Sequence, residues 1–299
     1  MIRLLAVISL LLCALSPVYA GSVHILLSDS GTLYREAADH LRAELTVAGF
    51  SEPVKIHELN NISASGIEAT DLIVTIGQAA AAYSQQTFSR NRQLYSFIDF
   101  TALPAKHSQN WAAVVLDQPL QRMFDITQTI LEARFRNTVV IAVSENNHRL
   151  RQEIEQLKVP SQLDLKVLVV NEQAEPAKQV EKLLFNAGAL IAIRDKHIWS
   201  GENARWMLYQ SYKFNVPVIG YSKNFLKAGA LVSVYASLPE TAVKTARLID
   251  DWHANQGSFS RPGIHYPDFT IEFNKNIARA LKIPIPVTLP EGMENNVRD

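Results

Sequence analysis

Small polar residues follow several short apolar runs in this sequence, at points where a buried strand would end. In the clearest case, residues 216–219 are apolar, β-branched and opened by proline, and Gly220, Tyr221 and Ser222 follow them. Ligands of open α/β sheets bind outside the carboxyl ends of the strands. Tyr221 and Ser222 are therefore the first candidates for contact with a bound molecule, although simple packing at the strand end would also account for Tyr221.

Two glycine-containing loops lie directly before predicted helices. Their candidate residues are Ser28, Ser30 and Gly31 after the apolar run 23–27, and Gly77, Gln78 and Ala79 after the run 71–76. The amide groups and the positive dipole end of a helix start favour a carboxylate or a phosphate. Helix capping by Ser28, Asp29 or Ser30 and a tight turn at Gly77 would explain the same residues without a ligand, and both interpretations stay open.

Two acidic residues also lie at predicted strand ends. Asp99 follows the run 94–98, and Asp195 follows the run 189–193. Either carboxylate could accept a charge-assisted hydrogen bond from an ammonium group, and together with the helix starts they would suit a zwitterion. For Asp195, an ion pair with Arg194 or Lys196 is the alternative. Further candidates are Ser144 and Asn146 in the exit loop 144–147, and Phe100, Trp199 and Tyr221 as apolar walls.

Sequence motifs of common enzymes are missing. The chain has no Gly-x-Ser-x-Gly elbow, no phosphate-binding Walker loop, no Gly-x-Gly-x-x-Gly and no His-Glu-x-x-His. Its eight histidines are scattered, with no pair at the spacing of metal ligands. We therefore expect a binding protein rather than an enzyme, without catalytic residues, cofactor or metal.

The first 20 residues have the composition of a secretory signal peptide. Arg3 precedes an apolar run at 4–15, and Ala20 lies where a signal peptidase would cleave. Such a run is too short for a hydrocarbon core of about 30 Å. Leu12 before Cys13 argues against a lipid anchor, which needs a small residue there. We predict cleavage after Ala20 and a soluble periplasmic protein.

The mature chain is nearly neutral and long enough for more than one core. Without Arg3 it keeps 28 Lys and Arg against 29 Asp and Glu, a net charge of −1, so no basic excess points to nucleic acid or acidic lipid. The single cysteine leaves with the signal, which excludes disulfides and thiolate chemistry. A length of about 280 residues favours two lobes over one.

Strand and helix patterns alternate along the mature chain, which is typical of βα units and parallel sheets. The predicted fold class is α/β with two lobes, each a parallel sheet flanked by helices, and a ligand cleft between them. Residues 258–267 are expected to be a loop, and Trp206 and Trp252 to be core residues. The predicted divisions are a signal peptide at 1–20, lobe 1 at 21–117 completed by about 237–266, lobe 2 at 118–236 completed by about 267–290, and a tail at 291–299.

Four segments, taken in order, resemble the ABC-transporter substrate-binding family that includes tryptophan- and tyrosine-type binding proteins. The likeness spans nearly the whole mature chain. The segments are Leu27-Ser28 with Gly49-Phe50, Ile73-Val74-Thr75-Ile76-Gly77-Gln78-Ala79-Ala80, the strand end Ala192-Ile193-Arg194-Asp195 with Pro217-Val218-Ile219-Gly220-Tyr221-Ser222 and Ala228-Gly229-Ala230-Leu231, and the closing Phe273-Asn274-Lys275-Asn276-Ile277-Ala278-Arg279-Ala280-Leu281.

The resemblance implies a type I periplasmic-binding-protein fold and a small ligand, often an amino acid, held between the lobes. The family's ligand loops match Ser28 to Gly31, Gly77 to Ala79, Asp99, Ser144 to Asn147, Asp195 and Ser222. Departures from the family pattern at 196–199 and 100–101 concern the ligand rather than the fold. We therefore expect a solute-binding component that closes by hinge motion and docks on a membrane permease. The alternative is a ligand-sensing partner of a membrane signalling receptor.

Overall fold

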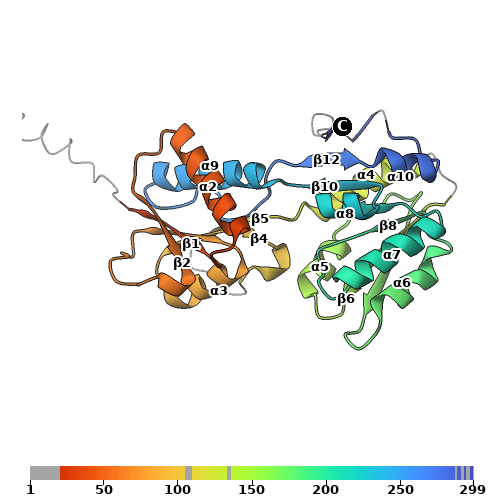
Figure 1. Ribbon diagram of the computed structural model, residues 1–299, viewed down its shortest axis with the longest axis horizontal. Helices are drawn as coiled ribbons and strands as arrows, with labels where there is room; N and C mark the ends of the chain where they lie inside the picture. The colour runs from red at the N-terminus through yellow and green to blue at the C-terminus, as the bar shows by residue number, and fades with distance from the viewer. Residues whose placement is uncertain are drawn as a thin grey trace, which may run out of the picture. The chain divides into compact units, whose positions relative to one another are not determined.

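The chain divides into two compact units (Figure 1). The computed structural model describes residues 21–104, 110–132, 136–286, 288–290, 293 and 297–298. The predicted signal peptide and most of the predicted tail lie outside these residues. Unit 1 comprises Met1–Ser96, Pro104–Ala113 and Thr245–Gly263, and unit 2 comprises Phe97–Leu103, Val114–Lys244 and Ile264–Asp299. Residues 97–103 and 114–117, which the sequence analysis assigned to lobe 1, therefore belong to unit 2 by their contacts.

The sheet of unit 1 has the strand order β11-β5-β4-β3-β1-β2. The pairs β1–β2, β1–β3 and β3–β4 are parallel, and Val23 of β1 lies opposite both Val54 and Leu72. The strands are β1 (Val23–Leu27), β2 (Val54–Glu58), β3 (Leu72–Ile76), β4 (Arg92–Ile98), β5 (Ala112–Val115) and β11 (Gly263–His265).

Amphipathic helices cover the sheet of unit 1. Helix α2 buries Ala37, Ala38, Leu41 and Leu45, whose spacing of three or four residues places them on one face. Residues of β1, β3 and β4 are buried almost throughout, on both faces of the sheet, which explains their continuous apolar runs. The helical segments are α2 (Thr32–Val47), α3 (Gln78–Thr87), the 3₁₀ turn η1 (Leu59–Asn61) and α9 (Leu238–Ala254), which belongs to unit 1 from Thr245 on.

The sheet of unit 2 has the strand order β13-β12-β10-β9-β8-β6-β7. It is parallel except for the pair β10–β12, which is antiparallel. The strands are β6 (Thr138–Ser144), β7 (Asp164–Val170), β8 (Ala189–Ile191), β9 (Val218–Gly220), β10 (Val232–Tyr235), β12 (Thr270–Phe273) and β13 (Val297–Arg298). Two open, mostly parallel sheets with helices confirm the predicted α/β class.

Two hydrophobic clusters lie on the opposite faces of the unit 2 sheet. Val139, Ile141 and Val143 of β6 join one cluster, and the alternate residues Val140 and Ala142 join the other. This alternation is what a strand buried on both faces requires. The helical segments are the 3₁₀ turn η2 (Phe100–Ala102), α4 (Leu120–Leu131), α5 (His148–Glu155), α6 (Pro176–Leu184), α7 (Gly201–Lys213), α8 (Lys223–Ala228) and α10 (Lys275–Ala280).

The stretch that the sequence analysis singled out forms consecutive elements of unit 2. β9 leads through Tyr221 and Ser222 into α8, and β10 follows. The Ser222 side chain accepts a hydrogen bond from Phe225 N at 3.4 Å, which caps α8. Gly229 ends the helix with a φ of 116°, a conformation that glycine adopts without steric cost.

Two expectations for the end of unit 1 and for the tryptophans need correction. Residues 258–267 are not entirely loop, because Gly263 N donates to Trp111 O at 2.8 Å and starts the short edge strand β11. Trp252 is fully buried as expected, but Trp206 is 46% exposed. Trp206 lies on the outer side of α7, whose inner side is formed by the buried Met207 and Leu208.

Among the described residues, no helix has the length and apolar character needed to cross a membrane.

We expect the two tryptophans to contribute very differently to stability. Trp252→Ala should lower the free energy of unfolding by about 3–5 kcal/mol, because it leaves a cavity in a closed core. Trp206→Ala should lower it by less than about 1 kcal/mol, because half of the ring already contacts water. Urea unfolding of the two variants of the mature protein measures both changes, and equal losses would contradict the assignment of Trp206 to the surface.

Candidate functional site

Ser28 connects three elements at the strand ends of unit 1. Its hydroxyl group donates to Ile76 O at 2.9 Å and accepts from Ala80 N at 3.0 Å. Ser28 thereby joins the end of β1 to the end of β3 and supplies an acceptor to the first turn of α3. Capping of the helix that follows Ser28, the alternative in the sequence analysis, is wrong, because the N-cap of α2 is Gly31 and no side chain caps it.

Gly77 holds the entry to α3 in a conformation that a larger residue would not adopt. Its φ is 92°, and a Cβ atom would lie 2.5 Å from Tyr34 Cε1 and 2.7 Å from Ser28 Oγ. Gly77 N donates to Ser96 O at 3.0 Å, which fixes the turn to β4. The turn therefore explains Gly77 without a ligand. It also brings Ser28, Gly77 and the exposed residues Gln78 and Ala79 together at one edge of the sheet.

The loop before α2 is exposed. Gly31 N donates to Asp29 Oδ1 at 2.6 Å, which closes a local turn. Ser30 and Gly31 both face solvent. The structure therefore places the unit 1 candidates next to two helix starts, in the arrangement that the sequence predicts for an anion, and their contact with a ligand stays a prediction.

A charged cluster around Arg194 lies beyond the end of β8 in unit 2. Arg194 Nη1 lies 3.4 Å from Asp99 Oδ1, and Arg194 Nε lies 3.5 Å from Asp117 Oδ1. The guanidinium carbon is 4.8 Å from the centre of the Tyr221 ring, within the range of a cation–π interaction. Lys196 Nζ lies 3.9 Å from Asp99 Oδ2. The structure thus brings the predicted residues Asp99 and Tyr221 together around an arginine.

Asp117 is the most strongly shifted acid of this cluster. The pKa of Asp117 is raised to about 6, mainly by burial; the carboxylates of Asp99 and Glu153 contribute to the rise, whereas the Arg194 charge and a hydrogen bond from Phe100 N oppose it. That amide donates to Asp117 Oδ2 at 2.5 Å. Burial also raises the pKa of the Tyr221 phenol. The pKa of Asp117 therefore lies well above that of an ordinary aspartate.

Arg194 and Asp117 were not among the site residues predicted from the sequence. Arg194 was considered only as an ion-pair partner of Asp195 and as part of a segment that carries the family resemblance, and Asp117 was not considered as a site residue. Both have the signal that selected Asp99, a charged residue directly after an apolar run. Which neighbours such a side chain meets depends on the folded positions of segments that are far apart in sequence.

Asp195 occupies a different position from the rest of the cluster. It is 3% exposed, and its carboxylate accepts hydrogen bonds from Ser144 N at 2.9 Å, Asn147 Nδ2 at 3.1 Å, His197 N at 3.1 Å and Ile198 N at 3.3 Å. These donors join the ends of β6 and β8. The carboxylate has a structural role that the sequence analysis did not foresee, and its contact with a ligand stays a prediction.

The remaining unit 2 candidates line the same strand ends. Ser144 is 5% exposed, and its amide is tied to Asp195. Asn146 is exposed, whereas Asn147 caps α5 by accepting from Leu150 N at 3.3 Å. Of these residues, Asn146 has the side chain most accessible to a bound molecule.

Unit 1 also contains a surface cavity. Its volume is about 420 Å³. It lies beside α2 and β2 and includes none of the predicted site residues. Among the described residues, no group of three or more His, Cys, Asp or Glu side chains is arranged to hold a metal ion. The residues that line the cavity are Leu27, Arg35, Ala38, Asp39, Ile56, His57, Glu58 and Asn61.

Comparison with solved structures identifies the fold. No family model matches the sequence, and no curated protein sequence matches it. An ABC domain in complex with L-Trp from Streptococcus pneumonia is 17% identical, with a TM-score of 0.61 over 93% of this chain and 99% of that one. A ligand-free, open substrate binding protein with adhesive properties from Clostridium difficile is 13% identical, with a TM-score of 0.65 over 90% and 97%.

A third neighbour supports the same conclusion. The periplasmic ribose ABC transporter from Conexibacter woesei is 12% identical, with a TM-score of 0.56 over 89% of this chain and 96% of that one. At these identities the likeness establishes the fold. The predicted type I periplasmic-binding-protein fold, which ABC solute-binding proteins share, is confirmed.

We expect Asp117 to give unfolding a specific pH dependence. Its native pKa of about 6 exceeds the unfolded value of about 4, so the native state binds the extra proton between these values. The free energy of unfolding should therefore fall by roughly 3 kcal/mol as the pH rises from about 4 to about 6. Asp117→Asn should remove this contribution. Urea unfolding of both proteins across pH 4–7 measures the difference, and parallel curves would contradict the burial of the charge.

We expect Asp195→Ala to destabilise unit 2. The substitution leaves the buried amides of Ser144 and Ile198 without their acceptor, which should cost about 2–4 kcal/mol. Asp164→Ala, at an exposed position of the same unit, should cost less than about 1 kcal/mol. Urea unfolding of the two variants tests the structural role, which would be ruled out if Asp195→Ala were as stable as Asp164→Ala.

Proposed function

We propose that this protein is the solute-binding component of an ABC-type uptake system, which captures a small polar or amino-acid-like ligand and delivers it to a membrane permease. The Arg194 cluster of unit 2 is the observation that carries this proposal. It lies at the carboxyl ends of the strands, where ligands of open α/β sheets bind, in a fold that ABC solute-binding proteins share.

The chemistry of the Arg194 cluster suits a ligand that carries both a negative and a positive charge. The side chains of Arg194 and Asp99 are 21% and 22% exposed, so part of each charge is accessible. A ligand carboxylate would bind the guanidinium group, and a ligand ammonium group would bind Asp99. The ring of Tyr221, which is partly buried, offers an apolar wall beside them. The balanced charges of the cluster favour a zwitterion over an anion or a cation.

The unit 1 candidates would supply the second half of recognition. Ligand binding favours a closed form only through contacts that the open form lacks, so we expect residues of both units to contribute. The N-terminus of α3 offers amide groups and the positive end of a helix dipole. In this proposal the residues that contact the ligand are Ser28, Ser30, Gly31, Gly77, Gln78, Ala79, Asp99, Ser144, Asn146, Asp195, Tyr221 and Ser222, together with Arg194.

The proposed function also requires that the protein be exported to the periplasm. An N-terminal charge, an apolar run and small residues near position 20 support a periplasmic location after signal cleavage. A ligand-sensing role beside a membrane receptor would use the same ligand residues. Co-purification of the protein with a permease or with a receptor separates the two roles.

We expect a thermal-shift screen of the mature protein to identify the ligand class. Amino acids, nucleosides, sugars and small organic acids should be compared, because a ligand that binds only the folded state raises the melting temperature. Calorimetry with the best compound should show that Arg194→Gln and Tyr221→Ala each weaken binding at least tenfold, about 1.4 kcal/mol.

Trp206→Ala is the matched control for the calorimetry, because Trp206 is an exposed aromatic residue of the same unit. It should leave the affinity unchanged. The proposal fails if no compound raises the melting temperature. The assignment of the site fails if Arg194→Gln binds the identified compound as tightly as Trp206→Ala does.

A further inference from the structure

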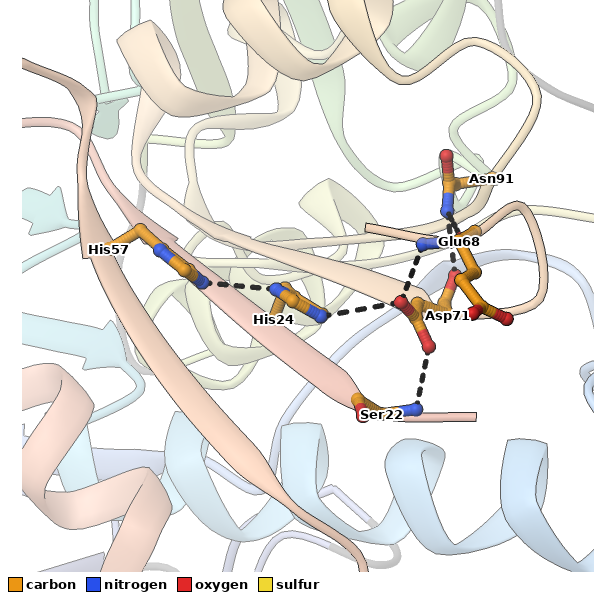
Figure 2. A network of polar contacts seen from close by, with 6 residues as sticks. All are labelled: Ser22, His24, His57, Glu68, Asp71 and Asn91. Carbon is orange, nitrogen blue, oxygen red and sulfur yellow. Dashed lines mark hydrogen bonds and ion pairs between the residues drawn. The ribbon is translucent and has the colours of Figure 1, made fainter. Parts of the chain in front are cut away.

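Three titratable side chains form a line across the sheet of unit 1, and none of them belongs to the candidate site. Figure 2 shows His24 between the carboxylate of Asp71 and the ring of His57. His24 Nε2 lies 3.4 Å from Asp71 Oδ2, and His24 Nδ1 lies 3.0 Å from His57 Nε2. The two rings are nearly parallel, at an angle of 8°. The line leads from a buried acid in the turn before β3 to the edge strand β2.

Strand register brings the two histidines together. His24 of β1 lies opposite Lys55 of β2, and His57 follows Lys55 by two residues. Residues two apart in a strand point to the same face, so both rings lie on one face of the sheet. Leu26 and Ile73 share this face and pack with Ala80 and Phe88 of the α3 region. The histidines therefore replace apolar side chains in a mostly apolar layer.

Asp71 is held firmly enough to orient His24. Its Oδ1 accepts from Ser22 N and its Oδ2 from Glu68 N, each at 2.8 Å. The Asn91 side chain donates to Glu68 O at 2.6 Å and to Asp71 O at 3.1 Å, as Figure 2 shows. His24 is 1% exposed and Asp71 5%. A rotation of either side chain would break these contacts, so the line has one arrangement in the folded unit.

The contact between the rings limits how many protons the pair can hold. A hydrogen bond between His24 Nδ1 and His57 Nε2 needs one N–H donor and one bare acceptor nitrogen. The neutral pair satisfies this condition, and so does a pair with one added proton facing Asp71. With two added protons both nitrogens carry hydrogen, and the 3.0 Å contact becomes repulsive.

The surroundings of the pair oppose protonation. Burial lowers the pKa of His24, and the His57 and Lys55 charges lower it further, whereas Asp71 raises it. Burial and Lys55 also lower the pKa of His57. Because the native pKa values lie below the usual value of 6.5, the contribution of the pair to stability is complete above pH 6.5 and is lost as the pH falls through the native values.

We propose that Asp71, His24 and His57 form a pH-operated clasp, which holds the edge strand β2 in unit 1 and releases it when the histidine pair takes up two protons. β2 is the last strand of its sheet, with β1 as its partner among the described strands. Its residues are half-buried or exposed, whereas those of β1 and β3 are buried. Besides the clasp, β2 is held by its pairing with β1 along Val54–Glu58 and by the ion pair of Glu58 with Arg35 of α2 at 3.0 Å. As an edge strand it has a sheet partner on one side, so loss of the clasp should lower its protection.

Hydrogen exchange of the mature protein tests the clasp. The protection of the β2 amides, corrected for intrinsic exchange rates, is compared with that of β6 in unit 2 at pH 7, 6 and 5. In the unmodified protein the β2 protection should fall at least tenfold between pH 7 and pH 5, while that of β6 changes less than threefold. His57→Gln removes the second charge and should reduce the fall to less than twofold.

His40→Gln is the matched control, because His40 is an exposed histidine on α2 of the same unit. It should behave as the unmodified protein does. Constant β2 protection in the unmodified protein overturns the proposal, as does an equal fall in His57→Gln. If His57→Gln does not fold, NMR titration of the histidine side chains in the unmodified protein decides. The proposal requires that β2 protection be lost over the same pH range in which the pair takes up its second proton. Loss of protection over a different pH range overturns it.

Discussion

A parallel sheet that is buried on both faces leaves polar side chains few places other than the strand ends. In unit 2, β6 alternates between two hydrophobic clusters, so the polar groups gather after its last residue and after those of β8 and β9. There they neutralise one another, because a buried charge without a partner is costly. The Arg194 cluster and the hydrogen bonds to Asp195 are two outcomes of this constraint.

The two outcomes differ in what they leave accessible. Asp195 uses its carboxylate on four donors of its own unit and is almost fully buried. Arg194 and Asp99 lie at ion-pair distances of 3.4 Å or more and keep about a fifth of their surface exposed. A site that binds and releases a ligand needs accessible polar groups such as those of Arg194 and Asp99. Their contacts with water or with each other must be replaced by contacts with the ligand. The same strand ends thus contain the buried hydrogen bonds of Asp195, which have a structural role, and the accessible ion pairs of Arg194, which a ligand could replace.

Hydrophobic periodicity was sufficient to predict the α/β fold, the strands near 23–27, 71–76, 94–98, 189–193 and 216–219, and the strand-end positions of Asp99 and Tyr221. It was not sufficient to predict side-chain partners. Arg194 meets Asp117, which lies 77 positions earlier, only because separate segments of unit 2 converge. The His24–His57 contact likewise depends on the register of two strands, and neither residue stands out in a sequence with eight scattered histidines. The surface position of Trp206 was missed because helical spacing alone does not say which side of α7 faces water.

The discontinuity of unit 1 has a consequence for the order in which the protein forms. Its last segment, Thr245–Gly263, carries the fully buried Trp252 and a Thr245 hydroxyl group 2.6 Å from Ser96 Oγ. A growing chain that stops before residue 245 lacks both, so its first hundred residues cannot close their core. Contacts between residues so distant in sequence carry a high entropic cost and slow folding. The chain therefore remains without a complete first unit until most of it has been synthesised, a state in which it can still be threaded through a narrow pore.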